Sequence, residues 1–284
     1  MCTNSGHPRL QFFPLDELLK RIEFLKAQGF KRVMLTGGEP TIHSAFKSVI
    51  TNLFAADMSW NLNTHGRKFR SVEFTKTTQA LGLHKVIVSL HSHEVTQSCT
   101  ISGQSERGHY ETINGIHNLL KAGIDVTINC VVTRLNMGTL HEYLDYCRDL
   151  FGLNIKIKFV FPSSSGKGRL WGGTKIRFEE VRQELQGLLR VASQGNAKVQ
   201  FESIPLCVLN DTQVKNISRS GFGETHYLED THGKSILSMR FLESKYHVYA
   251  EPCVDCAVID HCSGVQLSYL ERHGTAEFVP FVPD

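Results

Sequence analysis

The sequence alternates between segments with helical spacing of apolar residues and short apolar runs. Apolar residues recur every three or four positions over residues 15–28, which predicts an amphipathic helix, and the apolar run 33–35 predicts a buried strand. The same order recurs in the predicted helix and strand pairs 43–55 with 60–63, 71–81 with 85–91, 110–121 with 125–133, and 140–150 with 155–162. Five strands alternating with helices predict an α/β fold with a parallel sheet, because parallel neighbours need crossover connections.

The pattern changes after one more amphipathic helix, predicted over residues 178–191. From residue 198 onward the alternation of helix and strand is not predicted to continue, and residues 210–236 have the composition of an exposed loop. The sequence therefore predicts two domains, a large one over residues 1–195 and a small one over residues 196–284.

Composition narrows the functional classes. The 284 residues are 41% hydrophobic and 21% charged, which is typical of a globular protein with a core. The formal net charge of +3 is too balanced for a dedicated nucleic-acid binder, so no nucleic-acid partner is expected. The chain contains no apolar run long enough to span a membrane and no signal peptide at its start, so we expect a cytoplasmic protein without a membrane partner.

Polar and small residues gather where the predicted strands end. In chain order they are Gly37, Gly38, Glu39, Pro40, Asn63, Thr64, Ser89 and Asn129. Glycine pairs expose backbone amides to a ligand, and hydroxyl, amide and carboxylate groups form hydrogen bonds with polar ligands. Periodicity alone fits an open sheet and a barrel equally. In both architectures the carboxyl ends of the strands form the active edge, so a polar ligand is predicted there.

Cysteines cluster near the C-terminus. Cys253, Cys256 and Cys262 lie within ten positions, and the two-residue gap lets a tight turn aim the first pair at one metal centre. Cys207 is a candidate fourth ligand. Four thiolates at these spacings fit a structural zinc site at least as well as an iron–sulfur cluster. The residues therefore predict a metal site without deciding which metal it holds.

Several segments together resemble the core of radical S-adenosylmethionine (SAM) enzymes. They are, in chain order, LTGGEPTIH, NLNTHGRKF, VSLHSHE, GHYETINGIHNLLKAGIDVTINCVVTRLN and FVFP, and the resemblance covers roughly residues 1–165. The C-terminal cysteines resemble the auxiliary-cluster extension of that superfamily, which is called twitch when it holds one cluster and SPASM when it holds two. With four cysteines for one cluster, this chain is similar to the twitch form.

The resemblance implies a partial (β/α)6 barrel of TIM type, followed by a small Cys-rich twitch-like domain. In family members a [4Fe-4S] cluster, held by three cysteines in a Cys-x3-Cys-x2-Cys pattern, leaves one iron position for SAM. An electron then cleaves SAM to methionine and a 5′-deoxyadenosyl radical, which takes a hydrogen atom from the substrate. The chemistry belongs to the cofactors, and the protein binds and orients them. No side chain of this chain is predicted to be catalytic.

The resemblance also assigns residues to the cofactors. It implies that Gly37, Gly38 and Glu39 contact the SAM amino group, and that Ser89 and Asn129 contact its carboxylate or ribose. Three more residues of the strand ends are candidate cofactor contacts: Pro40, Asn63 and Thr64. The metal ligands implied are Cys2 for the SAM cluster, and Cys207, Cys253, Cys256 and Cys262 for an auxiliary [4Fe-4S] cluster.

The N-terminus departs from the family pattern. Only Cys2 precedes Gly37, and the first barrel strand and two cluster cysteines are absent. We expect Met1 to be an internal residue of a longer protein, and the chain as written to be poorly active. The alternative is a naturally complete chain that lost the SAM cluster and kept the twitch centre. His65 stands where relatives commonly have Asn, and His91, near the same edge, is interpreted as a solvated loop histidine.

Three functional interpretations follow. The first is a radical SAM enzyme that abstracts hydrogen from a peptide or small-molecule substrate, with an electron donor such as a flavodoxin or ferredoxin. The second is a zinc-stabilised α/β binding protein without SAM chemistry. The third is a degenerate iron–sulfur electron-transfer partner of another protein. The resemblance favours the first.

Overall fold

The computed structural model describes residues 13–162, 171–195, 197–210, 226–228, 236–238 and 246–282. The chain forms two compact units. Unit 1 comprises Met1–Cys130 and Tyr146–Lys156, and unit 2 comprises Val131–Asp145 and Ile157–Asp284. The two-domain division after residue 195, which the change in sequence pattern predicts, stays a prediction.

One parallel sheet contains the six longer strands, in the order β1-β2-β3-β4-β5-β6. Its strands are β1 (Arg32–Leu35), β2 (Ser59–Thr64), β3 (Leu83–Ser89), β4 (Asp125–Val131), β5 (Lys156–Val160) and β6 (Lys198–Glu202). Helix α1 (Leu15–Ala27) precedes β1, and the α-helices between the strands are α2 (Phe46–Ala55), α3 (Val72–Ala80), α4 (Val95–Ser102), α5 (Glu106–Lys121), α6 (Leu140–Phe151) and α7 (Phe178–Ser193). This alternation is the α/β architecture that the sequence predicts.

Short elements complete the described part of the chain. The 3-10 turns are η1 (Pro40–Ile42), η2 (Arg67–Arg70), η4 (Gly172–Thr174), η5 (Glu251–Cys253) and η6 (Ile259–His261). The C-terminal helices are α8 (Leu206–Leu209) and α10 (Leu267–His273). Two small antiparallel pairs join β7 (His226–Leu228) with β8 (Ile236–Ser238), and β9 (His247–Val248) with β10 (Val265–Gln266).

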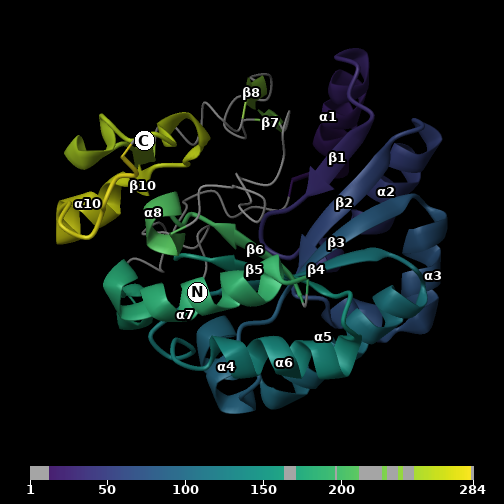
Figure 1. Cartoon of the computed structure of the whole chain (residues 1–284). Coiled ribbons are helices and arrows are strands. Elements are labelled where there is room, and N and C mark those ends of the chain that lie inside the picture. The colour runs from purple at the N-terminus through teal and green to yellow at the C-terminus, as the bar shows by residue number, and fades with distance from the viewer. Residues whose placement is uncertain are drawn as a thin grey trace. The chain divides into compact units, whose positions relative to one another are not determined.

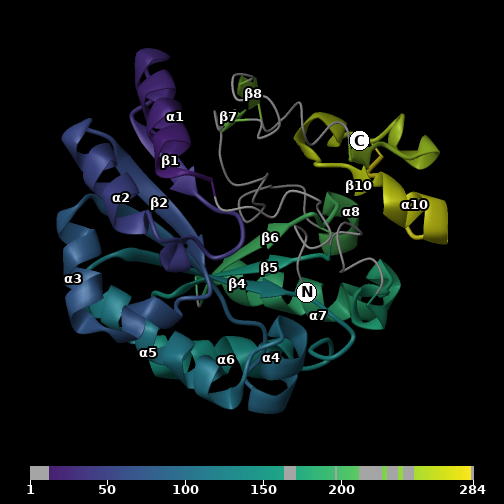
Figure 2. The ribbon, with the colours of Figure 1, turned by 180° about the vertical axis from the view of Figure 1, so that it is seen from behind.

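The two faces of strands β2 to β4 in unit 1 differ in polarity. One face is apolar and at most 3% exposed, and it consists of Leu62, Val86, Val88, Val126 and Ile128. Helices α2, α3 and α5 lie along the outer side of these strands (Figure 1), and the view from behind shows the same arrangement (Figure 2). Phe46 of α2 packs edge-on against the buried Trp60 of β2, with ring centroids 5.8 Å apart. The apolar face therefore carries the core of unit 1.

Two sequence predictions need correction. The alternation does not stop at residue 198, because β6 is a sixth strand of the sheet. Its sequence KVQFE buries Val199 and Phe201 and exposes Lys198 and Gln200, so it has the period-two pattern of a half-buried strand and not a continuous apolar run. Helix α5 begins at Glu106, earlier than predicted, because the Ser105 hydroxyl accepts a hydrogen bond from Gly108 N at 3.2 Å and caps it.

No helix in the described ranges combines the length and the apolar character that crossing a membrane requires.

Candidate functional site

Strand register places three of the predicted cofactor residues on one face of the sheet. Asn63 pairs with Ile87 of β3, and Ser89 pairs with Asn129 of β4. Side chains alternate along a strand, so Asn63, Ser89 and Asn129 all lie on the face opposite the apolar core. Asn63 is exposed, and Ser89 and Asn129 are half-buried. The structure thus brings these residues together as a polar surface at the carboxyl ends of adjacent strands.

Farther along the strands the same face carries the buried apolar Ile87 and further polar residues. Asn61 lies in register with Lys85, and Lys85 with Asp125, whose carboxylate pairs with Lys156 Nζ at 2.7 Å. A parallel sheet is ordinarily apolar on both faces because helices cover both. A face with amide, ammonium, carboxylate and hydroxyl groups is suited to a polar ligand.

Two buried polar atoms on this face have no hydrogen-bond partner among the residues that the structure describes. They are Asn61 Oδ1 and the hydroxyl oxygen of Thr127, and Thr127 is only 2% exposed. A buried polar group without a partner costs free energy, so each of these atoms is suited to a ligand that completes its hydrogen bonding. Sequence reasoning missed both residues. The signal was present in the alternation of β4, where Thr127 lies two positions before Asn129 on the same face.

Glu39 makes its hydrogen bonds within the chain. Its Oε1 accepts hydrogen bonds from Thr41 N at 3.2 Å, the Thr41 hydroxyl at 2.5 Å and the Thr64 hydroxyl at 2.7 Å. Its Oε2 accepts the backbone N–H of His65 at 2.8 Å, and the side chain is 8% exposed. The carboxylate therefore joins the segments that follow β1 and β2, a role that the resemblance does not imply.

Thr64 faces the buried side of the sheet. Besides donating to Glu39, its hydroxyl accepts Gly66 N–H at 3.0 Å, and the residue is 4% exposed. Pro40 opens the short turn η1, for which Glu39 is the N-cap. Thr64 and Pro40 thus shape the edge in this structure, while Gly37 and Gly38 are exposed, with no neighbouring atom within 4 Å of an added Cβ.

His65 is fixed in one tautomer by its neighbours. Its Nδ1 accepts the backbone N–H of Arg67 at 3.2 Å, so the ring proton of the neutral form lies on Nε2. Burial lowers the pKa of His65, and the nearby Glu39 carboxylate, 3.4 Å from Nδ1, opposes that shift. The backbone oxygen of His65 accepts the Thr112 hydroxyl of α5 at 2.8 Å.

The turn after β2 packs closely against α5. Gly66 adopts φ +80°, and an added Cβ would lie 2.8 Å from Val88 Cγ1. An added Cβ on Gly115 of α5 would lie 2.3 Å from the Gly66 oxygen. Only glycine fits at both positions. The close packing of the turn after β2 against its neighbours therefore fixes the conformation at the carboxyl end of β2.

His91 lies at the end of β3 and corrects a further expectation. It is 8% exposed, and burial lowers its pKa to about 4, so it is a buried neutral histidine rather than a solvated one.

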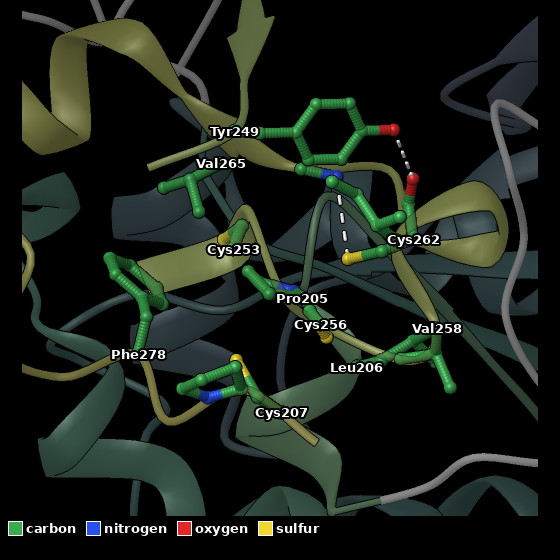
Figure 3. A pocket seen from close by; sticks show the side chains of 13 residues that line it. Pro205, Leu206, Cys207, Tyr249, Cys253, Cys256, Val258, Cys262, Val265 and Phe278 are labelled. Atoms are coloured by element: carbon green, nitrogen blue, oxygen red, sulfur yellow. Dashed lines mark hydrogen bonds between the residues drawn. The ribbon is translucent and has the colours of Figure 1, made fainter. Parts of the chain in front are cut away.

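The C-terminal cysteines line one pocket in unit 2. Cys207 comes from α8, Cys253 ends η5, and Cys262 follows η6. Figure 3 shows the sulfurs of these residues and of Cys256 arranged around the middle of the pocket. Cys256 and Cys262 each end a turn of the same kind. Cys256 N donates a hydrogen bond to Cys253 O, and Cys262 N donates one to Ile259 O, each at 3.1 Å.

The rest of the pocket is apolar apart from one phenol. Its other lining residues are Pro205, Leu206, Tyr249, Val258, Ile259, Gly264, Val265, Phe278 and Pro280. Burial, together with the neighbouring thiols Cys262 and Cys253, raises the pKa of Cys207 to about 11. A bound cation would reverse that preference, since metals bind the thiolate form. Thiols are the donor type that iron–sulfur clusters and structural zinc sites use, and all four line this one pocket.

The positions of the cysteine side chains bear on whether they could hold a single metal ion. Within the part of the chain that the structure describes, no three His, Cys, Asp or Glu side chains are grouped in a way that could hold a metal ion. Cys2, the predicted ligand of the SAM cluster, lies outside the described residues.

Comparison with known proteins decides the family. A profile described as the radical SAM superfamily matches residues 1–147, which is more than half of the chain. The chain belongs to the radical SAM superfamily. The predicted resemblance is therefore confirmed for the core. Membership of this superfamily implies a [4Fe-4S] cluster and SAM.

Curated relatives of this radical SAM protein include cyclases. It is 27% identical over 194 residues to GTP 3′,8-cyclase of Helicobacter pylori, covering 66% of this chain and 59% of that enzyme. It is 24% identical over 207 residues to Molybdenum cofactor biosynthesis protein 1 of Mus musculus, covering 70% of this chain and 31% of that protein. The chain spans less than two thirds of the length of both relatives.

Solved radical SAM structures share the fold. SuiB of Streptococcus suis bound to S-adenosylmethionine has a TM-score of 0.60 and 14% identity, covering 98% of this chain and 72% of that one. Native anSMEcpe with bound AdoMet and Kp18Cys peptide has a TM-score of 0.56 and 13% identity, covering 70% of this chain and 58% of that one. The likeness confirms a partial TIM-like barrel.

Proposed function

We propose that this radical SAM protein cleaves SAM reductively and abstracts a hydrogen atom from a polar small molecule or peptide. The observation that carries the proposal is the polar surface of Asn63, Ser89 and Asn129 beside the exposed Gly37–Gly38 pair, in a chain whose superfamily is established. Hydroxyl and amide groups there match the carboxylate and ribose hydroxyls of SAM.

In this proposal the residues at the carboxyl ends of the strands contact different groups of SAM. The exposed Gly37 and Gly38 offer backbone carbonyl oxygens to the SAM amino group. Ser89 and Asn129 donate hydrogen bonds to its carboxylate or ribose, and Asn63 contacts the same ligand from β2. Glu39 contributes indirectly, because its carboxylate accepts the backbone N–H of His65 and so holds the turn after β2 in place. When bound, the cluster for which Cys2 is a ligand supplies the electron that cleaves SAM.

A second metal group belongs to the proposal. The four thiols of Cys207, Cys253, Cys256 and Cys262 line one pocket and would hold an auxiliary [4Fe-4S] cluster, as a twitch-like domain does. Four protein ligands leave no iron open for substrate, so this cluster would relay electrons or stabilise the fold. A flavodoxin or ferredoxin is the proposed electron donor. Zinc in the same pocket is the alternative, which metal analysis of the purified protein distinguishes.

The substrate class stays broad at this point. The relatives named as GTP 3′,8-cyclases support a small molecule, whereas the structure of anSMEcpe with bound Kp18Cys peptide supports a peptide. The polar groups along β2 to β4 suit either, because amide and hydroxyl groups bind nucleotide and peptide alike.

The test combines metal analysis with SAM binding. After anaerobic reconstitution with iron and sulfide, we expect about four iron atoms per auxiliary cluster, a brown colour and their loss in Cys256→Ala. We expect SAM binding in calorimetry, and only slow formation of 5′-deoxyadenosine after dithionite addition, because Cys2 is the one cysteine of this chain assigned to the SAM cluster. Asn129→Ala should weaken SAM binding about tenfold, because one hydrogen bond to a charged or polar ligand group is lost.

The matched control is Asn52→Ala. Asn52 is exposed on α2 and its side chain donates only a local hydrogen bond to Ser48 O. Zinc without iron, or SAM affinity equal in Asn129→Ala and Asn52→Ala, would contradict the proposal.

A further inference from the structure

Arg182 of α7 reaches the segment that carries the Cys207 thiol. Its Nη1 donates a hydrogen bond to Cys207 O at 3.1 Å, and its Nη2 donates to Glu277 O at 2.6 Å. The side chain is half-buried. One guanidinium therefore joins α8 to the C-terminal segment that supplies Phe278 to the same pocket.

Among the described residues that line the pocket, none is Asp, Glu, Lys or Arg, so the positive charge of Arg182 lies beside an uncharged set of side chains. A half-buried charge is screened less by salt and solvent than an exposed one.

Backbone groups complete the surroundings of the thiols. Gly264 N–H points at Cys262 Sγ at 3.4 Å, and Figure 3 marks this contact. Hydrogen bonds to the sulfurs and nearby charges are two of the protein features that adjust the reduction potential of an iron–sulfur cluster without changing its ligands. Arg182 supplies the second of them.

We propose that Arg182 is a positioning residue that holds Cys207 and sets the reduction potential of the cluster bound by the four thiolates. The inference rests on the auxiliary cluster of the proposed function. The cluster gains one electron from a donor and becomes more negative, so a fixed cation nearby stabilises the reduced state and raises the potential. Removing the charge makes the potential more negative, whereas keeping the charge on another side chain preserves it.

The experiment is a redox titration of the reconstituted protein with dithionite and ferricyanide, followed by electron paramagnetic resonance. The signal is assigned to the auxiliary cluster by its loss in Cys256→Ala. We expect a more negative midpoint potential in Arg182→Gln, which retains a hydrogen-bond donor but no charge. Arg182→Lys should titrate close to the wild type. Equal shifts in both variants, or no shift in Arg182→Gln with iron intact, overturn the inference.

Gln186 provides the matched controls. It lies one turn farther along α7, is half-buried, and donates to Val208 O at 2.9 Å. Gln186→Met removes that hydrogen bond without changing charge and should leave the potential unchanged. Gln186→Glu adds a negative charge and should lower the midpoint potential. This variant tests the electrostatic argument even if Arg182→Gln fails to retain iron. An unchanged potential in Gln186→Glu would then count against the inference. Absence of iron from the wild type refutes the auxiliary cluster itself.

Discussion

The carboxylate of Glu39 accepts the backbone N–H of His65 at 2.8 Å, and this bond links the loop after β1 to the turn after β2. The two segments are adjacent because β1 and β2 are parallel neighbours whose carboxyl ends meet at one edge. The negative charge of Glu39 thus stabilises the conformation of the edge to which the cofactor is proposed to bind.

Replacing Glu39 by Gln should destabilise unit 1. The amide NH2 of Gln would face donors, so at least one of the groups Thr41 N, Thr64 Oγ1 and His65 N loses its acceptor. We expect the free energy of unfolding in urea to fall by about 1–3 kcal/mol. The control is Glu23→Gln on the exposed side of α1, and an equal effect of both substitutions would contradict the role of Glu39.

Gly115→Ala should disrupt the packing of α5 on the turn after β2. Its added Cβ would lie 2.3 Å from the backbone oxygen of Gly66, which cannot move aside as a side chain can. We expect a loss of about 1–3 kcal/mol in urea unfolding. Gly108→Ala on the same helix is the control, because its Cβ meets side chains only, the nearest being Arg67 Nη1 at 3.2 Å. That variant should retain or gain stability.

Thr127→Val should stabilise the ligand-free protein. The Thr127 hydroxyl is buried without a partner, so exchanging it for a methyl group of similar shape removes a desolvation cost of about 1 kcal/mol. Thr75→Val is the matched control, because the buried Thr75 hydroxyl donates to Phe69 O and Ser71 O. The midpoint temperature of thermal unfolding should rise for Thr127→Val and fall for Thr75→Val, and a fall for both would refute the argument.

His91 should make stability depend on pH. Its folded pKa of about 4 lies below the unfolded value of about 6.5, so between these pH values the unfolded chain binds the proton that the folded chain does not. Stability is complete above pH 6.5 and falls with decreasing pH, by about 3 kcal/mol at pH 4 from this group. Urea unfolding of His91→Gln should show a shallower pH slope than the wild type, whereas His84→Gln, at an exposed position, should not.

Much of the fold was determined by local pattern. Helical periodicity and short apolar runs predicted five of the six sheet strands, since these signals arise within about a dozen residues. Strand β6 was missed because its alternating sequence KVQFE contains only two apolar residues, Val199 and Phe201, and was not recognised as a half-buried strand. The parallel arrangement followed from the helices between the strands.

The sequence also determined which residues stand at the strand ends and that four cysteines are available near the C-terminus. Only the tertiary structure decided which side chains share a face. Asn63 and Thr64 are neighbours in sequence, yet strand pleating sends Asn63 to the polar face and Thr64 to the buried side, where Glu39 binds it. Cys207 lines the same pocket as the distant Cys253, Cys256 and Cys262, and Arg182 of α7 donates to its backbone oxygen, because contacts between distant segments depend on packing that no local pattern encodes.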